Sequence, residues 1–577
     1  MNVLSMGLPF GTPGEPVQQF RSRCGHEVRV LAIEGACDWP FDAQDTAAAI
    51  VARMASKWTP DLFVCWCPEV VPPPLAIEAC PVKTVAVVSD WTVYFPQLEY
   101  NLSRYDIVLT DRLGAQTLRL PGSQPYYLGP LYSQRTGVHR PLGLERDIDI
   151  AFAGNLNHAT HSERGRLLEQ VAALNGRFRV VIASDLPPEE YTALFNRARI
   201  VFNYGLRHEM NLRCFEALAC GAALFVEEEN LEVAEVLRDR EAVVLYQPEN
   251  LTRLLEECLE RPGEAARIGA NGLARAETLA GENRLDALLE GIAGLPLSGR
   301  PFNTLPREER AMAEVLQYAS SPCPAQRTRA DQVLSQAVAR YPEEPAFRLA
   351  QACAQLQKLA DGPVDDRETR IQDLLGGLQA VASQHQQAAV PWLNLAFVSR
   401  RAQVPGAEER CLDLALQAAS PDWGGLLLGE RRDPYYARWR EGMAYGTASV
   451  QLLWAAAAAR LAMLLFDRRD TAGARELAQR SIRWRPDVPD PYRTLARAAE
   501  AEGSLEEAAA TLEEGLALTA FDSEYREQLI GVYRQLGRPD KAQQLAAQSA
   551  RIFGAWWAAA PVAERFRETA QELAPGV

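Results

Sequence analysis

Residues 204–230 read YGLRHEMNLRCFEALACGAALFVEEEN, and this segment decides the fold of the region around it. Its middle, from about residue 212 to 220, is mostly apolar and predicts a short, half-buried helix. The apolar runs RIVFNYG (199–205) and AALFV (222–226) flank it and have the composition of buried strands. A helix between two such runs is typical of an α/β domain built on a parallel sheet.

The same alternation of strands and helices extends in both directions from this segment. Residues 1–140 contain further strand-like runs, namely MNVLSMGL (1–8), HEVRVLAI (26–33), DLFVCWC (61–67), VKTVAVVSD (82–90) and YDIVLTD (105–111). A second series begins with IDIAFAGNL (148–156) and ends in helical patterns before residue 295. We predict two doubly wound, Rossmann-like domains in tandem, over residues 1–140 and 141–295. A ligand would bind in the cleft between them, at the carboxyl ends of their strands.

From about residue 300 the strand-like runs disappear and a sequence repeat replaces them. Three pairs of residues share one spacing of 34 positions: Leu495 and Leu529, Gly503 and Gly537, and Ala508 and Ala542. A further step back reaches Leu461, Ala474 and, in place of the glycine, Arg469. A helix-turn-helix period of 34 with small residues at the helix crossings is typical of tetratricopeptide repeats (TPR). We predict an α-solenoid of such repeats over 300–577, with a generic helical bundle as the alternative.

Composition and charge exclude several classes of protein. The chain of 577 residues has a net charge of -15, and nucleic-acid-binding proteins present basic surfaces instead. The first residues lack the charged and apolar regions of a signal peptide. The apolar run 452–466 contains Arg460 and is shorter than a membrane-spanning helix, so we expect no membrane span. The 11 cysteines are scattered without paired spacing, which favours reduced thiols and a cytoplasmic location.

Polar residues at the start of the predicted helix indicate an anion site. Asn211 is a suitable N-cap, and the free N–H groups near Leu212, at the positive end of the helix dipole, suit a diphosphate. Arg213 can add a bidentate phosphate contact, and Glu216 lies three residues on, on the same face. We expect Glu216 to face the cleft without a buried partner and to bind vicinal ribose hydroxyls. A local ion pair between Arg213 and Glu216 is the alternative.

The segment FEALACGAALFVEE (215–228) resembles the donor site of GT-B glycosyltransferases, and the form NLRCFEALACG (211–221) is most similar to their CgeB-like branch. This resemblance covers roughly residues 1–295, and it implies that the domain 1–140 binds the acceptor and the domain 141–295 binds the donor. It implies that Glu216 binds the ribose of a nucleotide-sugar. It also implies that the diphosphate is bound by Asn211, Leu212 and Arg213.

One position departs from the pattern of that family. Many relatives carry another glutamate eight residues before the first, where this chain has His208; Glu209 is adjacent but out of register. The resemblance implies that His208 or Glu209 replaces the missing glutamate at the sugar. The imidazole of His208 can also help to neutralise the leaving phosphate.

A second donor element is expected at the first strand-to-helix turn of 141–295. Gly154 and Asn155 occupy this turn, and the resemblance implies that it faces the diphosphate. His158 and His161 follow, but no carboxylate cluster accompanies the pair, so the sequence does not support a metal site there. The resemblance implies catalysis without a bound metal.

On the acceptor side, Asp90 ends the strand 82–90 at the cleft and is the candidate general base. A role as N-cap of the next segment is the alternative. Gly7 and Gly11 belong to a glycine-rich turn that we expect to line the same side. Trp66 and Trp91 can stack on sugar rings, although core packing is the stronger expectation.

We interpret the chain as a metal-independent glycosyltransferase that moves a sugar from a UDP- or GDP-linked donor to an acceptor, with no other cofactor. The repeats favour an acceptor protein bound in their groove, by analogy with bacterial flagellin or adhesin glycosylation. A polysaccharide or lipid-linked acceptor is one alternative, and a non-catalytic scaffold with a degenerate enzyme domain is another. Because the donor elements all precede residue 220, we expect a fragment ending near Gly294 to fold and bind donor.

Overall fold

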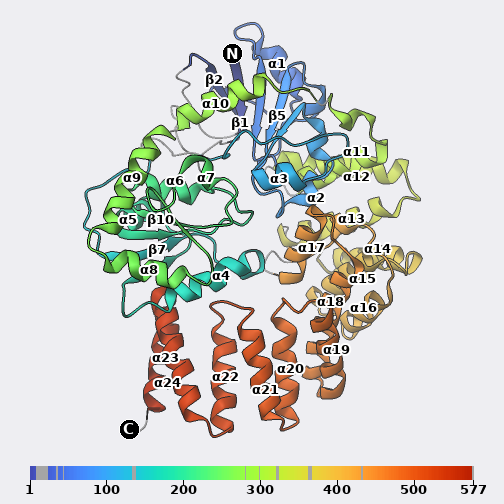
Figure 1. The fold of residues 1–577 in the computed structure, drawn as a ribbon. Helices are drawn as coiled ribbons and strands as arrows, with labels where there is room; N and C mark the ends of the chain where they lie inside the picture. Colours follow the sequence, from blue (N-terminus) through green and yellow to red (C-terminus); the bar gives the residue numbers. More distant parts are fainter. Residues whose placement is uncertain are drawn as a thin grey trace. The chain divides into compact units, whose positions relative to one another are not determined.

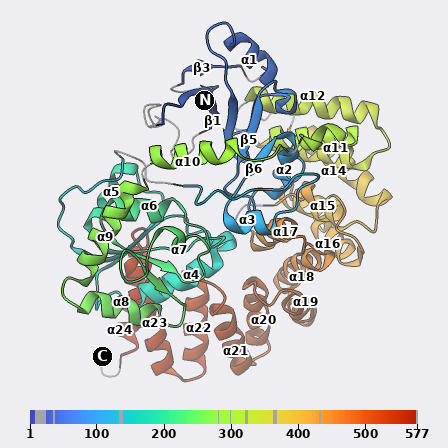
Figure 2. The ribbon, with the colours of Figure 1, turned by 45° about the horizontal axis from the view of Figure 1, so that its top comes forward.

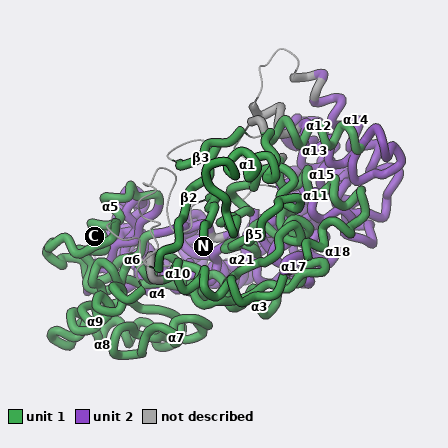
Figure 3. The backbone as a smooth tube through the Cα atoms, turned by 90° about the horizontal axis from the view of Figure 1, so that it is seen from above, with its two compact units in different colours: residues 1–153, 185–337 green, residues 154–184, 338–577 purple. Residues whose placement is uncertain are grey.

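The structure, a computed structural model, describes residues 1–7, 24–33, 37–42, 44–132, 138–279, 281–297, 299–319, 324–361, 367–429 and 433–574. The chain forms two compact units, and each unit combines segments that are distant in sequence (Figure 3). Unit 1 contains Met1–Ala153 and Asp185–Ala337. Unit 2 contains Gly154–Ser184 and Val338–Val577.

The first sheet of unit 1, of which β1, β2 and β5 are labelled in Figure 1, has the strand order β3-β2-β1-β4-β5-β6, and all of its pairings are parallel. This is the strand order of a Rossmann fold. Parallel strands covered on both faces need near-continuous apolar sequences, and every residue of LFVCW in β4 is buried. The strands are β1 (Asn2–Met6), β2 (Glu27–Ala32), β3 (Trp39–Pro40), β4 (Leu62–Trp66), β5 (Lys83–Val87) and β6 (Ile107–Leu109).

Short helices connect these strands, and a helix from much later in the chain completes their core. The connecting elements are α1 (Ala47–Met54), η2 (Ile77–Ala79), α2 (Phe95–Leu98), η3 (Asn101–Arg104) and α3 (Arg112–Thr117). Leu285, Leu288 and Leu289 of α10 (Gly281–Ala293) share one hydrophobic cluster with Val64 and Val85 of the first sheet. From its position in the sequence, α10 is predicted to belong to the second α/β domain. The apolar face of α10 instead contributes to the core of the first α/β domain.

The second sheet of unit 1 pairs its strands in parallel in the order β11-β10-β9-β7. Its strands are β7 (Ile148–Ala153), β9 (Ala198–Phe202), β10 (Ala223–Glu227) and β11 (Val244–Tyr246). Its helices are α5 (Pro188–Arg197), α6 (Leu212–Ala219), α7 (Val233–Val236), α8 (Leu251–Glu260) and α9 (Glu264–Thr278). Helix α9 contacts α6 and β10, and it approaches so closely that a Cβ on Gly269 would lie 2.3 Å from the carbonyl oxygen of Gly221.

Unit 1 continues past residue 300, where the sequence analysis places the start of the repeats. The elements there are η4 (Pro301–Thr304), α11 (Arg307–Ala319) and α12 (Pro324–Arg340), whose end passes into unit 2. Asn101 donates from Nδ2 to the carbonyl of Ala313 at 2.9 Å, and Arg300 donates to the carboxylate of Asp106 at 2.5 Å. These contacts bind α11 and the segment before it to the first α/β domain.

Unit 2 consists mainly of helices arranged in antiparallel pairs. They are α13 (Pro345–Asp361), α14 (Arg367–Gln384), α15 (Ala389–Arg401), α16 (Ala407–Gln417), α17 (Pro434–Ala444), α18 (Val450–Asp467), α19 (Thr471–Trp484), α20 (Asp490–Ala501), α21 (Leu505–Leu516), α22 (Ser523–Gln535), α23 (Pro539–Ala555) and α24 (Ala560–Glu572). The helices α18 to α23 follow one another as a row in both ribbon views (Figure 2). Unit 2 also contains α4 (His158–Ala172) and β8 (Val180–Ala183) from the middle of the predicted donor domain.

The 34-residue register predicts these helix pairs correctly. Ala474, Ala508 and Ala542 are each fully buried, because a side chain larger than a methyl group would separate the helices that cross there. Gly503 and Gly537 have φ values of 77° and 67° in the turns between paired helices. Arg469, which stands where the register predicts a glycine, has φ 68° and makes the same left-handed turn.

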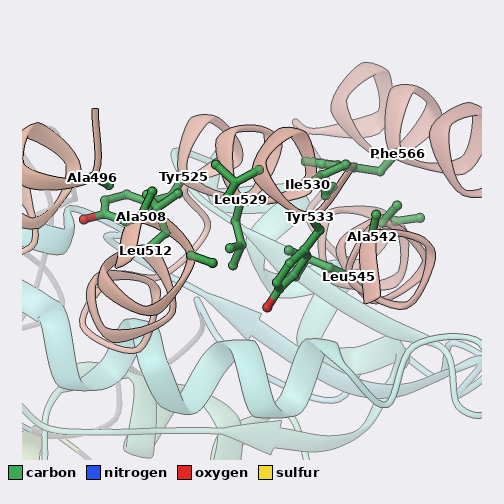
Figure 4. Packing of buried hydrophobic residues seen from close by; sticks show 14 of the residues in the cluster. Ala496, Ala508, Leu512, Tyr525, Leu529, Ile530, Tyr533, Ala542, Leu545 and Phe566 are labelled. Atoms are coloured by element: carbon green, nitrogen blue, oxygen red, sulfur yellow. The ribbon is translucent and has the colours of Figure 1, made fainter. Parts of the chain in front are cut away.

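The core of the last repeats is a continuous apolar row (Figure 4). Leu512 of α21, Tyr525 and Leu529 of α22 and Leu545 of α23 all belong to it. The predicted fold class is confirmed: parallel-sheet α/β domains are followed by a TPR-like helical region.

The apolar run 452–466 lies in α18, which has 18 residues and by length and composition alone could cross a membrane. It is the one such helix in the parts of the chain that the structure describes. In unit 2, α18 packs against α19, and Ala455, Ala458 and Leu461 are buried. Arg460 on this helix pairs with Glu408 of α16 at 2.7 Å. These contacts are those of a core helix in a helical repeat.

Candidate functional site

Within unit 1, the carboxyl ends of four strands carry polar side chains that contact one another. Asp90 follows β5 and Asp111 follows β6 in the first sheet. The loop 203–211 follows β9, and the segment 228–232 follows β10 in the second sheet. The carboxyl ends of parallel strands are where α/β proteins bind ligands, so this group is the candidate site.

Arg207 is the centre of this group, and sequence reasoning missed it. Its side chain is 2% exposed. Nε donates to Oδ2 of Asp111 at 2.9 Å, and Nη2 donates to Oδ1 of Asp90 at 3.2 Å. Glu209 accepts from the backbone N–H of Arg207 at 2.6 Å and from Nη2 at 3.4 Å. One guanidinium therefore joins the strand ends of the first sheet to the β9 loop of the second.

The charges in this network strongly affect one another. Burial alone would lower the pKa of Arg207, but Glu209, Asp111 and Asp90 raise it well above its ordinary value, so the guanidinium stays charged. Burial raises the pKa of Asp111, and Arg207 opposes that increase. Asp111 also accepts from Nε1 of Trp91 at 2.9 Å and from the backbone N–H of Gly114 at 2.7 Å, where it caps α3.

Asp90 is the most accessible carboxylate of this network. Its side chain is 46% exposed, compared with 2% for Asp111 and 6% for Glu209. A buried neighbour, Glu69, fixes its backbone: Oε1 of Glu69 accepts from the N–H of Asp90 at 3.0 Å and from the N–H of Ser89 at 2.9 Å. The following helix α2 has Tyr94 at its N-cap position. Asp90 is thus not the cap of that helix, and its carboxylate contacts Arg207 instead.

Two further buried glutamates accept hydrogen bonds from the backbone of the β9 loop. Glu227 accepts from the N–H of Gly205 at 3.1 Å and from Nδ2 of Asn230 at 2.9 Å, and burial raises its pKa to about 8. Glu232 accepts from the N–H of Met210 at 2.9 Å, and burial raises its pKa to about 7. Asn230 also donates to the carbonyl of Glu209 at 2.9 Å. The loop that carries Arg207 is therefore fixed at both of its ends.

His208 occupies the most unusual backbone position of this loop. Its φ is 55°, a left-handed conformation that is costly for a residue with a Cβ. The imidazole lies edge-on to Tyr204, with ring centroids 6.2 Å apart. Among the described residues, its Nδ1 has no hydrogen-bond partner. A polar atom held in this way next to the Arg207 network can accept or donate a hydrogen bond to a ligand.

Helix α6 has the bounds that the sequence predicts, and Gly221, φ 68°, directly follows its C-cap. Asn211 stands at the N-cap position, but its side chain makes no capping hydrogen bond. Glu216 in its middle is 4% exposed. Its Oε2 accepts from the hydroxyl of Tyr191 at 2.5 Å, and its Oε1 lies 3.3 Å from Nε2 of His139. The expectation of a carboxylate without a buried partner is wrong, because α5 and the segment before β7 supply two partners.

Arg213 is also held by groups of unit 1. Nε donates to the carbonyl of Ala153 at 2.7 Å, and Nη1 donates to Oδ1 of Asn203 at 2.8 Å. The guanidinium carbon lies 4.3 Å from the ring centroid of Phe152. Arg213 and Glu216 contact different partners, which is not the local ion pair that was the alternative. Arg213 joins α6 to the carboxyl ends of β7 and β9.

The remaining predicted donor residues, Gly154 and Asn155, belong to unit 2. The N–H of Gly154 donates to the carbonyl of Ala183 at 3.0 Å. Oδ1 of Asn155 accepts from the N–H of Asn157 at 2.8 Å, and Asn157 caps α4. The carbonyl of Asn155 accepts from Arg164 at 3.3 Å. This turn is therefore closely tied to the helix that follows it.

The remaining candidates of the acceptor side, two tryptophans and Gly7, are packed inside the first α/β domain. Trp66 donates to Ser5 at 3.1 Å and Trp91 donates to Asp111, and both side chains are buried, in agreement with core packing. A Cβ on Gly7, φ 78°, would lie 2.4 Å from the carbonyl oxygen of Trp66. Gly11 lies outside the described residues. No group of three or more His, Cys, Asp and Glu side chains among the described residues is arranged to hold a metal ion.

Comparison with known families supports the resemblance. Residues 145–290 match a family described as glycosyl transferase-like, and residues 465–529 match the tetratricopeptide repeat family. The chain thus contains a glycosyltransferase-like domain and TPR repeats, as predicted. TPR repeats are protein-interaction modules. The search of curated proteins finds no match.

Several solved structures are similar to parts of this chain. Sucrose-phosphate synthase from Thermosynechococcus elongatus is 12% identical, with a TM-score of 0.35 and coverage of 51% of this chain and 98% of that chain. TarM is 7% identical, with a TM-score of 0.30 and coverage of 43% and 58%. The pilF protein of Pseudomonas aeruginosa is 12% identical, with a TM-score of 0.31 and coverage of 45% and 98%.

Proposed function

We propose that this chain is a glycosyltransferase that uses a nucleotide-diphosphate sugar and in which Asp90 acts as the general base. The observation that carries this proposal is the contrast in exposure within the Arg207 network. Asp90 is the half-exposed carboxylate, while Glu69 fixes its backbone and Arg207 lies 3.2 Å from its Oδ1. A carboxylate that reaches solvent and has a fixed backbone can accept the proton of an acceptor hydroxyl.

The proposed reaction needs one proton transfer and one exchange of bonds. Asp90 takes the proton from an acceptor hydroxyl as its oxygen bonds to the anomeric carbon of the donor sugar. The bond from that carbon to the phosphate oxygen breaks, and the nucleoside diphosphate leaves. His208, with its Nδ1 available in the β9 loop, would donate a hydrogen bond to the departing phosphate. Glu209, bound to Arg207, is the alternative sugar contact.

For the donor, we propose that the start of α6 binds the diphosphate and that Glu216 binds the ribose. Asn211, Leu212 and Arg213 lie in the first turn of this helix, where the dipole favours an anion. Because Glu216 already accepts from Tyr191, ribose hydroxyls would have to share or displace that contact. Gly154 and Asn155 remain predicted diphosphate contacts. A UDP- or GDP-linked sugar fits a site that relies on a diphosphate.

For the acceptor, we propose a protein that binds to the helical repeats. Within unit 2 a cavity of about 440 Å³ lies among α15, α16, α17 and α18. Its lining combines aromatic side chains with charged ones, including Phe397, Tyr436, Arg460 and Asp490. Such a mixture suits a peptide segment with one apolar and one charged side chain. We also propose a cytoplasmic location, because cysteines scattered without paired spacing suit reduced thiols.

Calorimetry with UDP-, GDP-, dTDP- and CMP-linked sugars tests the donor proposal. We expect a sugar linked through a diphosphate to bind and a CMP-linked sugar not to bind, because CMP lacks the second phosphate. Release of nucleoside diphosphate from the donor that binds then reports on the chemistry. If no member of the panel binds, the non-catalytic scaffold becomes the better interpretation. If a donor binds but protein acceptors fail, a polysaccharide or lipid-linked acceptor replaces the protein.

A further inference from the structure

The segment 154–184 lies in the middle of the predicted donor domain, yet it belongs to the same compact unit as the helical repeats (Figure 3). It carries the turn at Gly154 and Asn155, helix α4 and strand β8. Within unit 2, α4 contacts α17 and α23, and β8 also contacts α23. The segment therefore contacts two helices of unit 2, α17 and α23, that are separated by five other helices in the sequence.

One contact in this unit involves a buried charge. Arg526 on α22 is 3% exposed, and its Nη2 donates to Oε1 of Glu169 on α4 at 2.8 Å. The same carboxylate oxygen accepts from the backbone N–H of Phe521 at 2.8 Å. Nη1 of Arg526 lies 3.4 Å from the hydroxyl of Ser549 on α23. Removing one member of a buried pair leaves the other charge uncompensated, so this contact strongly favours one placement of α4 on the repeats.

Further contacts fix the segment at its other parts. Arg438 on α17 donates from Nη2 to the hydroxyl of Ser162 near the start of α4 at 2.6 Å. Trp557, directly after α23, donates from its backbone N–H to the carbonyl of Ile182 in β8 at 2.8 Å. Asn175, after α4, donates to the carbonyl of Arg551 at 3.2 Å. The repeats thus hold the start of α4, its second half and the strand that follows.

Two hydrogen bonds join the turn before α4 to this helix. Asn157 caps α4 by accepting from the N–H of Ala159 at 3.2 Å. Arg164, which is buried and lies nearly two turns into α4, past the kink at His161, donates to the carbonyl of Asn155 at 3.3 Å. A displacement of α4 would therefore also displace the backbone of Gly154 and Asn155.

We propose that the helical repeats position the donor diphosphate turn Gly154–Asn157 through α4, and that Arg526 is the positioning residue for this turn. This inference rests on the proposed function, in which the turn faces the diphosphate. It gives the repeats a task beyond binding an acceptor, since part of their surface, on α17, α22 and α23, already holds a segment of this chain. It also revises the expectation that a fragment ending near Gly294 folds and binds donor, because that fragment lacks every repeat that contacts 154–184.

The test compares Glu169→Gln and Arg526→Gln with the full-length parent chain. The matched control is Arg538→Gln, which removes the exposed pair between Arg538 and Glu506, 2.6 Å apart, in the same repeats. Hydrogen exchange of peptides covering 154–184 reports the order of the turn and of α4. Donor KM and kcat are measured by release of nucleoside diphosphate, and Arg526→Lys serves as the conservative variant.

We expect Glu169→Gln and Arg526→Gln to speed exchange in 154–184 and to raise the donor KM about tenfold with kcat changed less than about twofold. Arg526→Lys should restore most of the KM, and Arg538→Gln should match the parent. A donor KM that stays at the parental value in folded Glu169→Gln protein would overturn the inference, as would unchanged exchange in 154–184. If the parent binds no nucleotide-sugar, the proposed function fails, whereas the exchange measurement still tests the hold of the repeats on α4.

Discussion

Helix α6 and the loop that precedes it differ in the partners of their charged groups. On α6, Arg213 donates to a carbonyl and an amide, and Glu216 contacts Tyr191 and His139. In the loop, Arg207 binds carboxylates from both α/β domains, and one of them, Asp90, is 46% exposed. The charged groups of α6 fix the helix to its neighbours in unit 1, whereas Arg207 of the loop contacts Asp90, a carboxylate that solvent can reach.

This difference separates charged residues that a sequence motif identifies from a charged residue that solvent can reach. Glu216 stands at the centre of the recognisable sequence pattern but is almost fully buried. Asp90 and Arg207 belong to no such pattern and form an ion pair between the two sheets, in which Asp90 is the exposed member and Arg207 is buried. Substitutions in the two regions should therefore affect different measurements.

Arg207→Gln should have the largest effect, on stability. The substitution leaves Asp111, 2% exposed, and Glu209 without their buried cation, and breaking such a network costs about 3–5 kcal/mol. Urea denaturation measures the free energy of unfolding. Arg199→Gln is the control, because the pair between Arg199 and Asp149, 2.8 Å apart, is partly exposed and should cost under about 1 kcal/mol. Equal losses in the two variants would contradict the central role of Arg207.

Asp90→Asn should lower kcat by about 100-fold or more while the donor KM changes little, because a general base acts mainly in the transition state. Its stability cost should be small, since the side chain is 46% exposed. Release of nucleoside diphosphate in the presence of acceptor gives both kinetic constants. Asp149→Asn, which also breaks a partly exposed pair with arginine, should keep the parental kcat. A loss of donor affinity equal to the loss of kcat would make Asp90 a structural residue.

Glu227 should make the stability of unit 1 depend on pH. Burial raises its pKa from 4.5 to about 8, so between these values the folded state keeps a proton that the unfolded state releases. The stability that protonated Glu227 contributes is therefore fully present below pH 4.5 and is lost as the pH rises through 8. Between about pH 6 and pH 8 the loss should approach about 2–3 kcal/mol. Glu227→Gln should lessen this dependence in urea titrations at several pH values, and an unchanged dependence would show that another group causes it.

Glu216→Gln should have a moderate effect on both stability and donor affinity. The amide keeps the size of the side chain but weakens the contacts to Tyr191 and His139, at about 1.5 kcal/mol. If Glu216 also binds ribose, as proposed, calorimetry should show a donor Kd about tenfold higher. Tyr191→Phe is the control, because it removes one partner of Glu216 and leaves the carboxylate in place. A variant that loses stability but keeps its donor affinity would show that Glu216 only anchors α6.

Local sequence patterns account for most of the fold. The apolar runs and their spacing predict the strands and α6, and the 34-residue period predicts the turns at Gly503 and Gly537. These features depend on contacts within a strand, a turn or neighbouring helices, which periodicity reports directly. Even Arg469, which breaks the pattern, adopts the backbone conformation that its position in the register requires.

The partners of the candidate site could not be predicted in the same way. Arg207 bonds to Asp111 and Asp90 across 96 and 117 positions of sequence, and Glu216 bonds to Tyr191 across 25. Long-range pairing is set by how the sheets pack, and a single sequence contains no periodic signal for it. The same holds for α4, whose bond to Arg526 spans 357 positions. The one available signal was position, because Asp111 ends the predicted strand 105–111 and Arg207 lies two residues after the run 199–205, where ligand sites form.

The smallest effect should come from removing divalent metal ions. The candidate site is rich in carboxylates, but they are engaged or neutralised: Arg207 pairs with Asp111 and Glu209, and burial raises the pKa of Glu227 to about 8 and that of Glu232 to about 7. Protonated or paired carboxyl groups are poor ligands for Mg²⁺ or Mn²⁺. We therefore expect donor turnover in excess chelator to stay within about twofold of its value without chelator. Loss of turnover that added Mg²⁺ or Mn²⁺ restores would show that these carboxylates release their present partners to bind a metal ion.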